Sequence, residues 1–406
     1  MHPAFSPLGF WNYTDVCNLI GAKYPASPLG LITMAAMLPQ EWELELVDMN
    51  TGPLADAQID WADLVFIGGM LPQQTQFLRL IDRVHSRGKK VVAGGAAPTS
   101  QPQVYESVDY LVLGEAECTL PMFLEDLRNG ATSGTYTCGE RPEMSQSPIP
   151  RFDLLKLNDY IMIGVQFSRG CPFNCEFCDI IELYGRVPRT KTPQQVINEL
   201  EALYRLGYRG HIDLVDDNLI GHRRKAQEML RQVLQWSERH GFPFYFSTEA
   251  SLNLADDDEL LDLMTSLDFR YVFVGIESPE NEILKTTQKR VNMGRDVIRD
   301  LRKIQRHGIV VNGGFILGFD QETEKTAPLM VELIKAGRIG MAMVGLLYAL
   351  PNTQLTRRLH RQGRMLGDVD SQRSLAVSDV DQATSGINFL TMRPRTDVLN
   401  DFVSVI

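Results

Sequence analysis

The feature that most constrains this chain is a group of three cysteines, Cys171, Cys175 and Cys178, at C-x3-C-x2-C spacing. They are half of the six cysteines in 406 residues, and they follow an apolar, β-rich run at residues 160–167. Three thiolates can hold three irons of a [4Fe–4S] cluster and leave the fourth iron without a protein ligand. Zinc is the competing interpretation, but a structural zinc site takes four ligands, usually as two C-x2-C pairs. The spacing therefore favours an open iron–sulfur cluster at the end of a strand.

The composition is that of an ordinary globular protein rather than a nucleic-acid-binding or membrane-spanning one. The net charge is −11 and no long Lys/Arg run occurs, which argues against nucleic acid as a partner. No apolar run approaches the ~20 residues that span a bilayer, and no secretory signal opens the chain. We therefore expect a cytoplasmic protein with reduced cysteines, in which Cys118 and Cys138 are ordinary thiols.

Residues 1–140 alternate short apolar runs with helical patterns. The runs that predict strands are residues 43–48, 64–69, 90–95 and 109–114, and the helical patterns are residues 28–38, 74–87 and 118–127. This alternation predicts an α/β fold with a parallel, doubly wound sheet. Ligands of such sheets bind beyond the carboxyl ends of the strands.

Glycine-bearing loops follow the predicted strands at residues 68–74, 94–99 and 114–117. Glycine lets a ligand approach the backbone closely, and three such loops on one sheet edge favour a binding site over three ordinary turns. The chain has no G-x-G-x-x-G motif, which argues against an ordinary dinucleotide site. The candidate cofactor contacts are Gly69, Gln73, Gly94, Gly95, Pro98, Thr99, Gly114 and Glu115.

The segments P-L-G-L at residues 28–31, G-G-x-x-P-T at 94–99 and G-E-A-E at 114–117 resemble the cobalamin-binding domain that precedes radical SAM domains. The resemblance implies a Rossmann-like, five-stranded sheet that holds cobalamin. The D-x-H-x-x-G motif of other cobalamin proteins is missing, so it also implies that no histidine binds the lower face of the corrin. His85 is expected on a helix surface. The family's first strand would precede His2, and we expect that the recorded chain starts after it.

A stretch rich in Gly, Ser, Thr and Pro at residues 129–150 predicts an interdomain linker. We place the cobalamin-binding domain at residues 1–140, the linker at 141–155, a barrel at 156–360 and the start of a helical C-terminal region at 361–406. Residues 365–390 are polar and irregular, and a helix with Val398, Phe402 and Ile406 on its apolar face follows.

Six strand–helix units predict a partial (β/α)6 barrel, whose catalytic groups belong at the carboxyl ends of the strands. Asp256 and Asp320 are expected as helix caps. The strands are expected at residues 160–167, 210–215, 244–247, 271–276, 310–315 and 342–347, separated by helices at 193–206, 222–241, 256–267, 293–307 and 321–336.

The cysteine loop, residues 168–178, resembles the signature of the radical SAM superfamily. The resemblance implies that Cys171, Cys175 and Cys178 are the cluster ligands and the catalytic residues, and that the open iron chelates S-adenosylmethionine (SAM). It implies that Phe177 packs near the adenine. The family's G-G-E segment is missing, so the expected SAM contacts are the polar residues at the strand ends: Asp216, Asp217, Asn218, Glu249, Glu277 and Ser278.

A basic loop with Arg186, Arg189 and Lys191 follows the cysteines. It is either a solvated loop or a source of positive charge that neutralises a reduced cluster or an anionic ligand. The sequence leaves both interpretations open.

Longer segments at residues 178–193, 215–221, 247–254 and 345–355 resemble the cobalamin-binding radical SAM subfamily that includes the hopanoid C-2 methylase. The resemblance implies methylation of an unactivated carbon. One SAM methylates cobalt(I), a second gives a 5′-deoxyadenosyl radical that abstracts hydrogen, and the substrate radical takes the methyl group. It also implies a hopanoid-type lipid or small-molecule substrate, a site of action in the cytosol or at a membrane surface, and a reductant such as flavodoxin or ferredoxin.

Three alternatives stay open at this point. A radical cyclase or rearrangement enzyme would use the same cofactors without methyl transfer. A cobalamin or iron–sulfur sensor would hold them without turnover, although the polar strand ends argue against it. A tRNA-modifying methylthiotransferase is disfavoured by the acidic charge.

Overall fold

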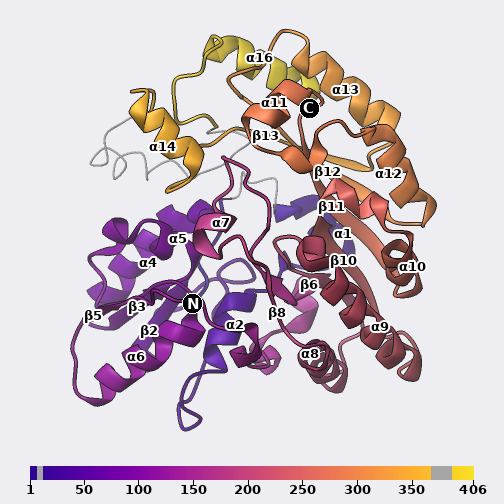
Figure 1. The fold of residues 1–406 in the computed structure, drawn as a ribbon. Coiled ribbons are helices and arrows are strands. Elements are labelled where there is room, and N and C mark those ends of the chain that lie inside the picture. The colour runs from indigo at the N-terminus through magenta and orange to yellow at the C-terminus, as the bar shows by residue number, and fades with distance from the viewer. Residues whose placement is uncertain (7–11, 367–385) are drawn as a thin grey trace. The chain divides into compact units, whose positions relative to one another are not determined.

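The computed structural model describes residues 1–6, 12–366 and 386–406, and the chain forms two compact α/β units (Figure 1). The first unit consists mainly of Met1–Gly164. The second consists of Val165–Tyr204, Arg209–Leu366 and the described C-terminal residues. The three cysteines lie in the second unit and the three glycine-bearing loops lie in the first.

A parallel four-stranded sheet forms the centre of the first unit, in the order β2 (Leu64–Gly68), β3 (Lys90–Gly94), β4 (Tyr110–Val112) and β5 (Gly134–Tyr136). Helices α4 (Gln74–Ser86) and α6 (Ala116–Arg128) cover its two faces (Figure 1). Side chains of a strand alternate between faces, so Val91 packs with Phe77 of α4 while Val92 packs with Phe123 of α6. This arrangement confirms the predicted doubly wound sheet. The smaller elements are α1 (Thr14–Ile20), β1 (Tyr24–Ala26), α2 (Leu29–Ala35), α3 (Asp56–Trp61) and α5 (Ala96–Ser100).

Helix α4 shows why the sequence pattern located these elements well. Its apolar residues Phe77, Leu80, Ile81 and Val84 recur at helical spacing and are all buried against the sheet. His85 lies at the end of the same helix, where its Nε2 is 3.1 Å from Asp109 Oδ2. The side chain of His85 is half-buried and lies on the helix, whereas the sequence predicts a position on the helix surface.

Three expectations for the first unit are wrong. Residues 43–48 do not form a strand. Among the described residues, their backbone pairs with another segment only at His2, whose N donates to Val47 O at 2.8 Å. The segment predicted as a linker contains β5, which completes the sheet beside β4. Cys118 and Cys138 are joined by a disulfide, with their Cα atoms 6.2 Å apart.

The second unit contains the predicted half-barrel. Strand β6 (Tyr160–Val165) ends at its border, where Val165 O accepts a hydrogen bond from Val215 N at 3.0 Å. The next five strands are parallel and lie side by side in sequence order. They are β9 (Gly210–Leu214), β10 (Phe244–Ala250), β11 (Phe269–Glu277), β12 (Val310–Leu317) and β13 (Met341–Leu346).

Helices cover the outer face of this curled sheet (Figure 1). Ile212, Val272 and Val311 are fully buried, which leaves the residues of opposite parity, such as His211 and Asp213, on the inner face. The covering helices are α8 (Pro193–Arg205), α9 (Arg223–Arg239), α10 (Asp258–Ser266), α12 (Val297–Arg306) and α13 (Thr326–Gly337).

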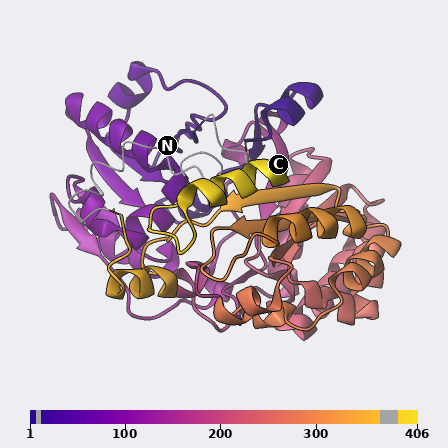
Figure 2. The ribbon, with the colours of Figure 1, turned by 90° about the horizontal axis from the view of Figure 1, so that it is seen from above.

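Two further helices end the described chain. Helix α14 (Gln354–Arg361) follows β13, and α16 (Arg395–Val405) packs against α13 and β13 (Figure 2). Val398 and Phe402 of α16 are buried, as the apolar pattern predicts, whereas Ile406 is exposed. Most of the predicted irregular segment, residues 367–385, lies outside the described residues. None of the described helices combines the length and apolarity needed to cross a membrane.

Candidate active site

The cysteine loop lies within a longer segment that begins and ends at a short antiparallel ribbon of β7 (Ser168–Arg169) and β8 (Arg189–Thr190). Gly170 has φ +94°, and a Cβ at this position would lie 2.9 Å from Gly185 O, so only glycine fits. Cys171 N donates to the same Gly185 oxygen at 3.2 Å and closes the loop. The ribbon and this contact present all three cysteines from one closed segment.

Two aspartates at the end of β9 hold the start of this loop. The carboxylate of Asp216 accepts hydrogen bonds from Phe167 N at 3.2 Å and from both the N–H and the hydroxyl of Ser168. Asp217 Oδ2 accepts one from Gly170 N at 2.7 Å. Burial raises the pKa of Asp216 to about 7, although the hydrogen bonds from Ser168 and Phe167 oppose the rise. Asp216 and Asp217, which the sequence predicts as SAM contacts, thus hold the start of the cysteine loop in position.

The three thiols are free, although the described residues contain no set of three side chains already spaced to hold a metal ion. Burial raises the pKa of all three, that of Cys175 to about 11. The Lys289 ammonium opposes this rise at Cys171 and Cys175. Thiolate is the ligating form of cysteine, and in this buried setting it needs a cation beside it. A [4Fe–4S] cluster, three of whose irons would each take one thiolate, would supply that charge.

Lys289 forms a buried ion pair with Glu277, the last residue of β11, with Nζ 2.8 Å from Oε1. Burial lowers the pKa of Lys289, but the charges of Glu277 and Cys175 outweigh it and raise the pKa above its ordinary value. Glu277 has φ +67° at a bulge in the β11–β12 pairing, a backbone conformation that non-glycine residues rarely adopt. Gly275 makes room for the pair, since a Cβ there would lie 2.9 Å from Lys289 Nζ. The backbone at the end of β11 therefore makes room for the Lys289 ammonium beside the thiols.

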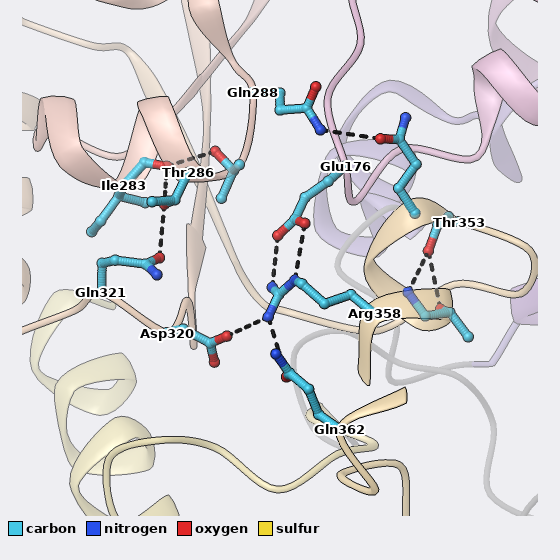
Figure 3. Close-up of polar contacts among 12 residues, drawn as sticks. Glu176, Ile283, Thr286, Gln288, Asp320, Gln321, Thr353, Arg358 and Gln362 are labelled. Atoms are coloured by element: carbon cyan, nitrogen blue, oxygen red, sulfur yellow. Dashed lines mark hydrogen bonds and ion pairs between the residues drawn. The ribbon is translucent and has the colours of Figure 1, made fainter. Parts of the chain in front are cut away.

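Arg358 of α14 holds the cysteine loop from another side (Figure 3). Its guanidinium donates to both carboxylate oxygens of Glu176, at 2.8 and 3.2 Å, and to Asp320 at 2.7 Å. Burial raises the pKa of Asp320, but hydrogen bonds from Arg364 and Arg358 outweigh it and hold the pKa below its ordinary value. Asp320 is thus an ion-pair residue rather than the predicted helix cap. Asp256 is also not a cap, since it pairs with Arg295 at 2.6 Å.

The backbone and the neighbouring amides fix the loop further. Glu176 N donates to Thr287 O at 3.0 Å, and Glu176 O accepts from Leu355 N of α14 at 2.8 Å. The side-chain amides of Asn174, Gln288 and Gln354 form a closed ring of three hydrogen bonds, at 2.5, 3.1 and 3.1 Å. The dashed line from Gln288 in Figure 3 belongs to this ring. The stretch between the cysteines is therefore held rigidly.

Acidic residues gather on the inner side of β9 and β10. Although part of Glu249 is exposed, burial raises its pKa to about 8, and the charges of Asp213, Asp217 and Asp216 add to the rise. Asn218 is buried next to Cys171, where its Nδ2 donates to Ser251 Oγ at 3.1 Å. Its Oδ1 has no hydrogen-bond partner, so a buried acceptor is available at this strand end. Together these groups form an environment that favours a cationic ligand.

The raised pKa of Glu249 predicts that the chain loses stability as the pH rises. The folded protein keeps the Glu249 proton up to about pH 8, whereas the unfolded chain loses it near 4.5. The folded state thus binds more protons between these values, and its stability falls through this window. In Glu249→Gln we expect a smaller fall of the melting temperature between pH 5 and pH 8, measured by calorimetry without added ligands.

The matched control for this experiment is Glu238→Gln, because Glu238 is exposed on α9, away from the acidic group. It should keep the pH slope of the unchanged protein. An equal slope in Glu249→Gln would show that Glu249 is ionised throughout the range and would contradict the prediction.

The other predicted SAM contacts lie at neighbouring strand ends. The ring of Phe177 packs against that of Phe319, which follows β12, with centroids 5.7 Å apart. Ser278 is buried, and its Oγ accepts a hydrogen bond from Glu280 N at 3.3 Å. Sequence reasoning missed Lys289 and Arg358. Lys289 follows α11 (Asn281–Thr286) in an irregular segment without a periodic signal, and Arg358 is one of several basic residues on an amphipathic helix.

In the first unit, the three glycine-bearing loops meet at the carboxyl ends of β2, β3 and β4. A Cβ at Gly95 would lie 3.1 Å from Gly69 O, and one at Gly94 would lie 2.9 Å from Val112 O. Gly114 N donates to Thr99 Oγ1 at 2.9 Å. The loops therefore form one continuous edge, and that this edge binds a ligand stays a prediction.

The exposed part of this edge suits a flat ligand. Gly95 and Gly114 are exposed with φ +92° and +81°, and Met70 adds an exposed apolar side chain. A ring system can lie directly on backbone where no Cβ intervenes. None of the three loops contains histidine. The residues present thus fit a corrin bound without a histidine ligand.

The remaining predicted contacts of these loops point into the protein. Gln73 is buried, and its amide accepts from Met70 N at 2.8 Å and donates to Pro3 O. Pro98 is buried in α5, and Glu115 is buried as the residue before α6. These three residues shape the loops and present little surface to a ligand.

Two family models match the chain. Residues 165–334 match the radical SAM superfamily, and residues 16–124 match the B12 binding domain. An uncharacterised methyltransferase of Synechocystis sp. is 43% identical over 99% of this chain and 74% of its own length. The hopanoid C-2 methylase of Rhodopseudomonas palustris is 38% identical over 84% of this chain and 66% of its own length.

A solved structure has the same fold. The radical S-adenosylmethionine methyltransferase TsrM from Kitasatospora setae superimposes with a TM-score of 0.71 at 17% identity, over 83% of this chain and 74% of that one. The two family models imply a [4Fe–4S] cluster, SAM and cobalamin as cofactors. The matches and the long relatives show that this chain belongs to the cobalamin-binding radical SAM family of enzymes.

Proposed function

We propose that this chain, a cobalamin-dependent radical SAM C-methyltransferase, transfers a methyl group to an unactivated carbon of a hopanoid-type lipid. The observation that carries the substrate class is the 38% identity to the hopanoid C-2 methylase over 84% of this chain. The 43% identity to a second methyltransferase over 99% of the chain supports methyl transfer more generally.

The cysteine loop would hold the cluster, with Cys171, Cys175 and Cys178 each binding one iron. When bound, the cluster and cobalamin supply the electron that cleaves SAM and the methyl group that is transferred. Lys289 offsets the negative charge of the thiolates, and Asp216 and Asp217 fix the start of their loop. Arg358 fixes Glu176 between the second and third ligands.

The strand ends next to the thiols would receive SAM, which carries positive charge on its sulfonium and amino groups. The positive charge of such a ligand would favour the ionised forms of Glu249 and of the aspartates after β9, whose pKa values are raised without it. Asn218 offers an unpartnered amide oxygen, and Phe177 with Phe319 forms an aromatic surface for a flat base. Glu277 and Ser278 lie at the next strand end along the sheet.

The glycine edge of the first unit would hold cobalamin through its exposed glycines, Gly95 and Gly114, with the buried Gly69 and the half-buried Gly94 beside them. A one-electron donor such as flavodoxin or ferredoxin would reduce the enzyme, which we expect to work in the cytoplasm or at a membrane surface. A radical cyclase and a cofactor-binding sensor are less favoured, because both long relatives are named as methyltransferases or methylases.

The test is an anaerobic reaction of the reconstituted enzyme with methyl-labelled SAM and a hopanoid-type lipid. We expect labelled lipid, together with 5′-deoxyadenosine and S-adenosylhomocysteine in equal amounts. Heat-treated enzyme serves as the control. 5′-Deoxyadenosine with an unlabelled, altered lipid would support the cyclase instead, and the lack of both nucleoside products would refute the enzyme assignment.

A further inference from the structure

A pocket of about 290 Å³ lies beside the cysteine loop. Half of its lining belongs to the short stretch between the first two cysteines, which reaches the surface here. Its lining residues are Pro172, Phe173, Asn174, Arg186, Gln288 and Arg290.

The charge of this pocket differs from that of the chain. Two arginines and no acidic residue line it, whereas the chain as a whole has a net charge of −11. Arg186 and Arg290 are exposed, and neither forms an ion pair with a carboxylate of the described residues. Within the described part of the chain, the hydrogen bond that Arg186 donates goes to Pro172 O, at 3.2 Å. By contrast Lys191, from the same basic loop, is buried in an ion pair with Glu199.

Apolar and rigid groups surround these two charges. Val187 follows Arg186 and is 76% exposed, one of the most exposed large apolar side chains of the described chain. Asn174 and Gln288 line the pocket, and their hydrogen bonds to each other and to Gln354 fix their positions. A preformed surface with a small apolar contact and unpaired cations suits a transient protein partner of opposite charge.

We propose that this pocket is the docking site of a small acidic one-electron carrier protein, whose surface carboxylates pair with Arg186 and Arg290. The proposal rests on the proposed function only in that the loop carries the cluster. The docked carrier loses one electron, the cluster gains it, and no covalent bond forms or breaks. Phe173 and Asn174 line the pocket together with the two docking arginines and lie between Cys171 and Cys175 in the chain, so the electron enters next to its acceptor.

The test compares reductants of opposite charge on the anaerobically reconstituted enzyme, without substrate. The rate of cluster reduction is followed by its visible absorption, with reduced flavodoxin (an acidic protein) or with the cationic methyl viologen radical. Electrostatic steering changes association rates by roughly 10- to 1000-fold. We therefore expect Arg290→Glu to slow reduction by flavodoxin at least about tenfold at low ionic strength, with no effect on methyl viologen.

The matched control is Arg306→Glu, because Arg306 is exposed at the end of α12, just before the amino end of β12 and thus at the opposite end of the barrel. The cluster of Arg306→Glu should be reduced at the unchanged rate by both reductants. Arg186→Gln is a second variant with a milder change. Equal rates with flavodoxin in Arg290→Glu and the unchanged protein, or equal slowing by both reductants, would overturn the proposal.

Binding is measured in parallel, so that the proposal does not depend on methyl transfer or on cluster content. Oxidised flavodoxin should bind the chain more weakly as salt increases and more weakly still to Arg290→Glu. Binding that is insensitive to both changes would exclude this docking site even if the methyltransferase assignment holds. A lipid that is not methylated, with docking intact, would refute only the proposed function.

Discussion

Replacing Cys175 by alanine should leave the chain folded and abolish both 5′-deoxyadenosine formation and methyl transfer. Cys175 is one of the three free thiols of the cysteine loop, and two thiolates cannot replace three as ligands. Anaerobic reconstitution followed by iron analysis, a visible spectrum and product quantification measures the effect. We expect the iron content and the cluster absorption to fall together with the products.

Cys17→Ala is the matched control, because Cys17 is also free and buried but lies in α1, outside the loop. It should keep iron, absorption and products. The circular dichroism spectrum of Cys175→Ala should equal that of the unchanged protein. Full iron binding in Cys175→Ala would mean that this thiol is not a ligand.

Replacing Lys289 by methionine should lower the free energy of unfolding more than the other substitutions proposed for this chain. The change leaves the Glu277 carboxylate buried without its partner, and breaking a buried ion pair from one side costs about 3–5 kcal/mol. Chemical unfolding followed by fluorescence measures the loss. Adding Glu277→Gln removes the unpaired charge, so the double variant should recover to within about 1–2 kcal/mol of the unchanged protein.

Lys285→Met is the control for this pair of variants. Lys285 is exposed and lies 3.5 Å from the exposed Glu282, and such surface pairs contribute only about 0–1 kcal/mol. If the single and double variants at residues 277 and 289 lost equal stability, the ion pair would not be the cause. The prediction requires the double variant to be the more stable one.

The half-barrel could be predicted from the sequence because each unit repeats the same signal. An apolar run such as residues 310–315 is followed by turn residues and an amphipathic helix, and the structure places a strand or helix at each. The three cysteines and the three glycine-bearing loops were found for a similar reason, since each is a short local motif. The three glycine-bearing loops could be predicted to lie together because parallel strands end on the same edge of a sheet.

The features that the sequence did not predict depend on contacts between segments that lie far apart in the chain. Residues 43–48 alternate like a strand, but a strand needs neighbours, and this segment pairs only beside His2. Residues 134–136 carry no periodic signal and become β5 because they meet β4. The disulfide joins cysteines 20 residues apart, whose approach is set by the fold and not by their spacing. Lys289 and Glu277 likewise meet only after a strand bulge brings them together.

The ring of Asn174, Gln288 and Gln354 joins the cysteine loop, the segment after α11 and the start of α14 through neutral groups alone. A brace built from ion pairs would tighten or loosen whenever an electron changed the charge of the neighbouring sulfur and iron atoms. Amides carry no net charge and do not titrate in the physiological range, so this contact responds weakly to such a change. This contact can therefore hold the Asn174 part of the loop in one shape through repeated cycles of oxidation and reduction, whereas the Arg358–Glu176 ion pair feels the change of charge.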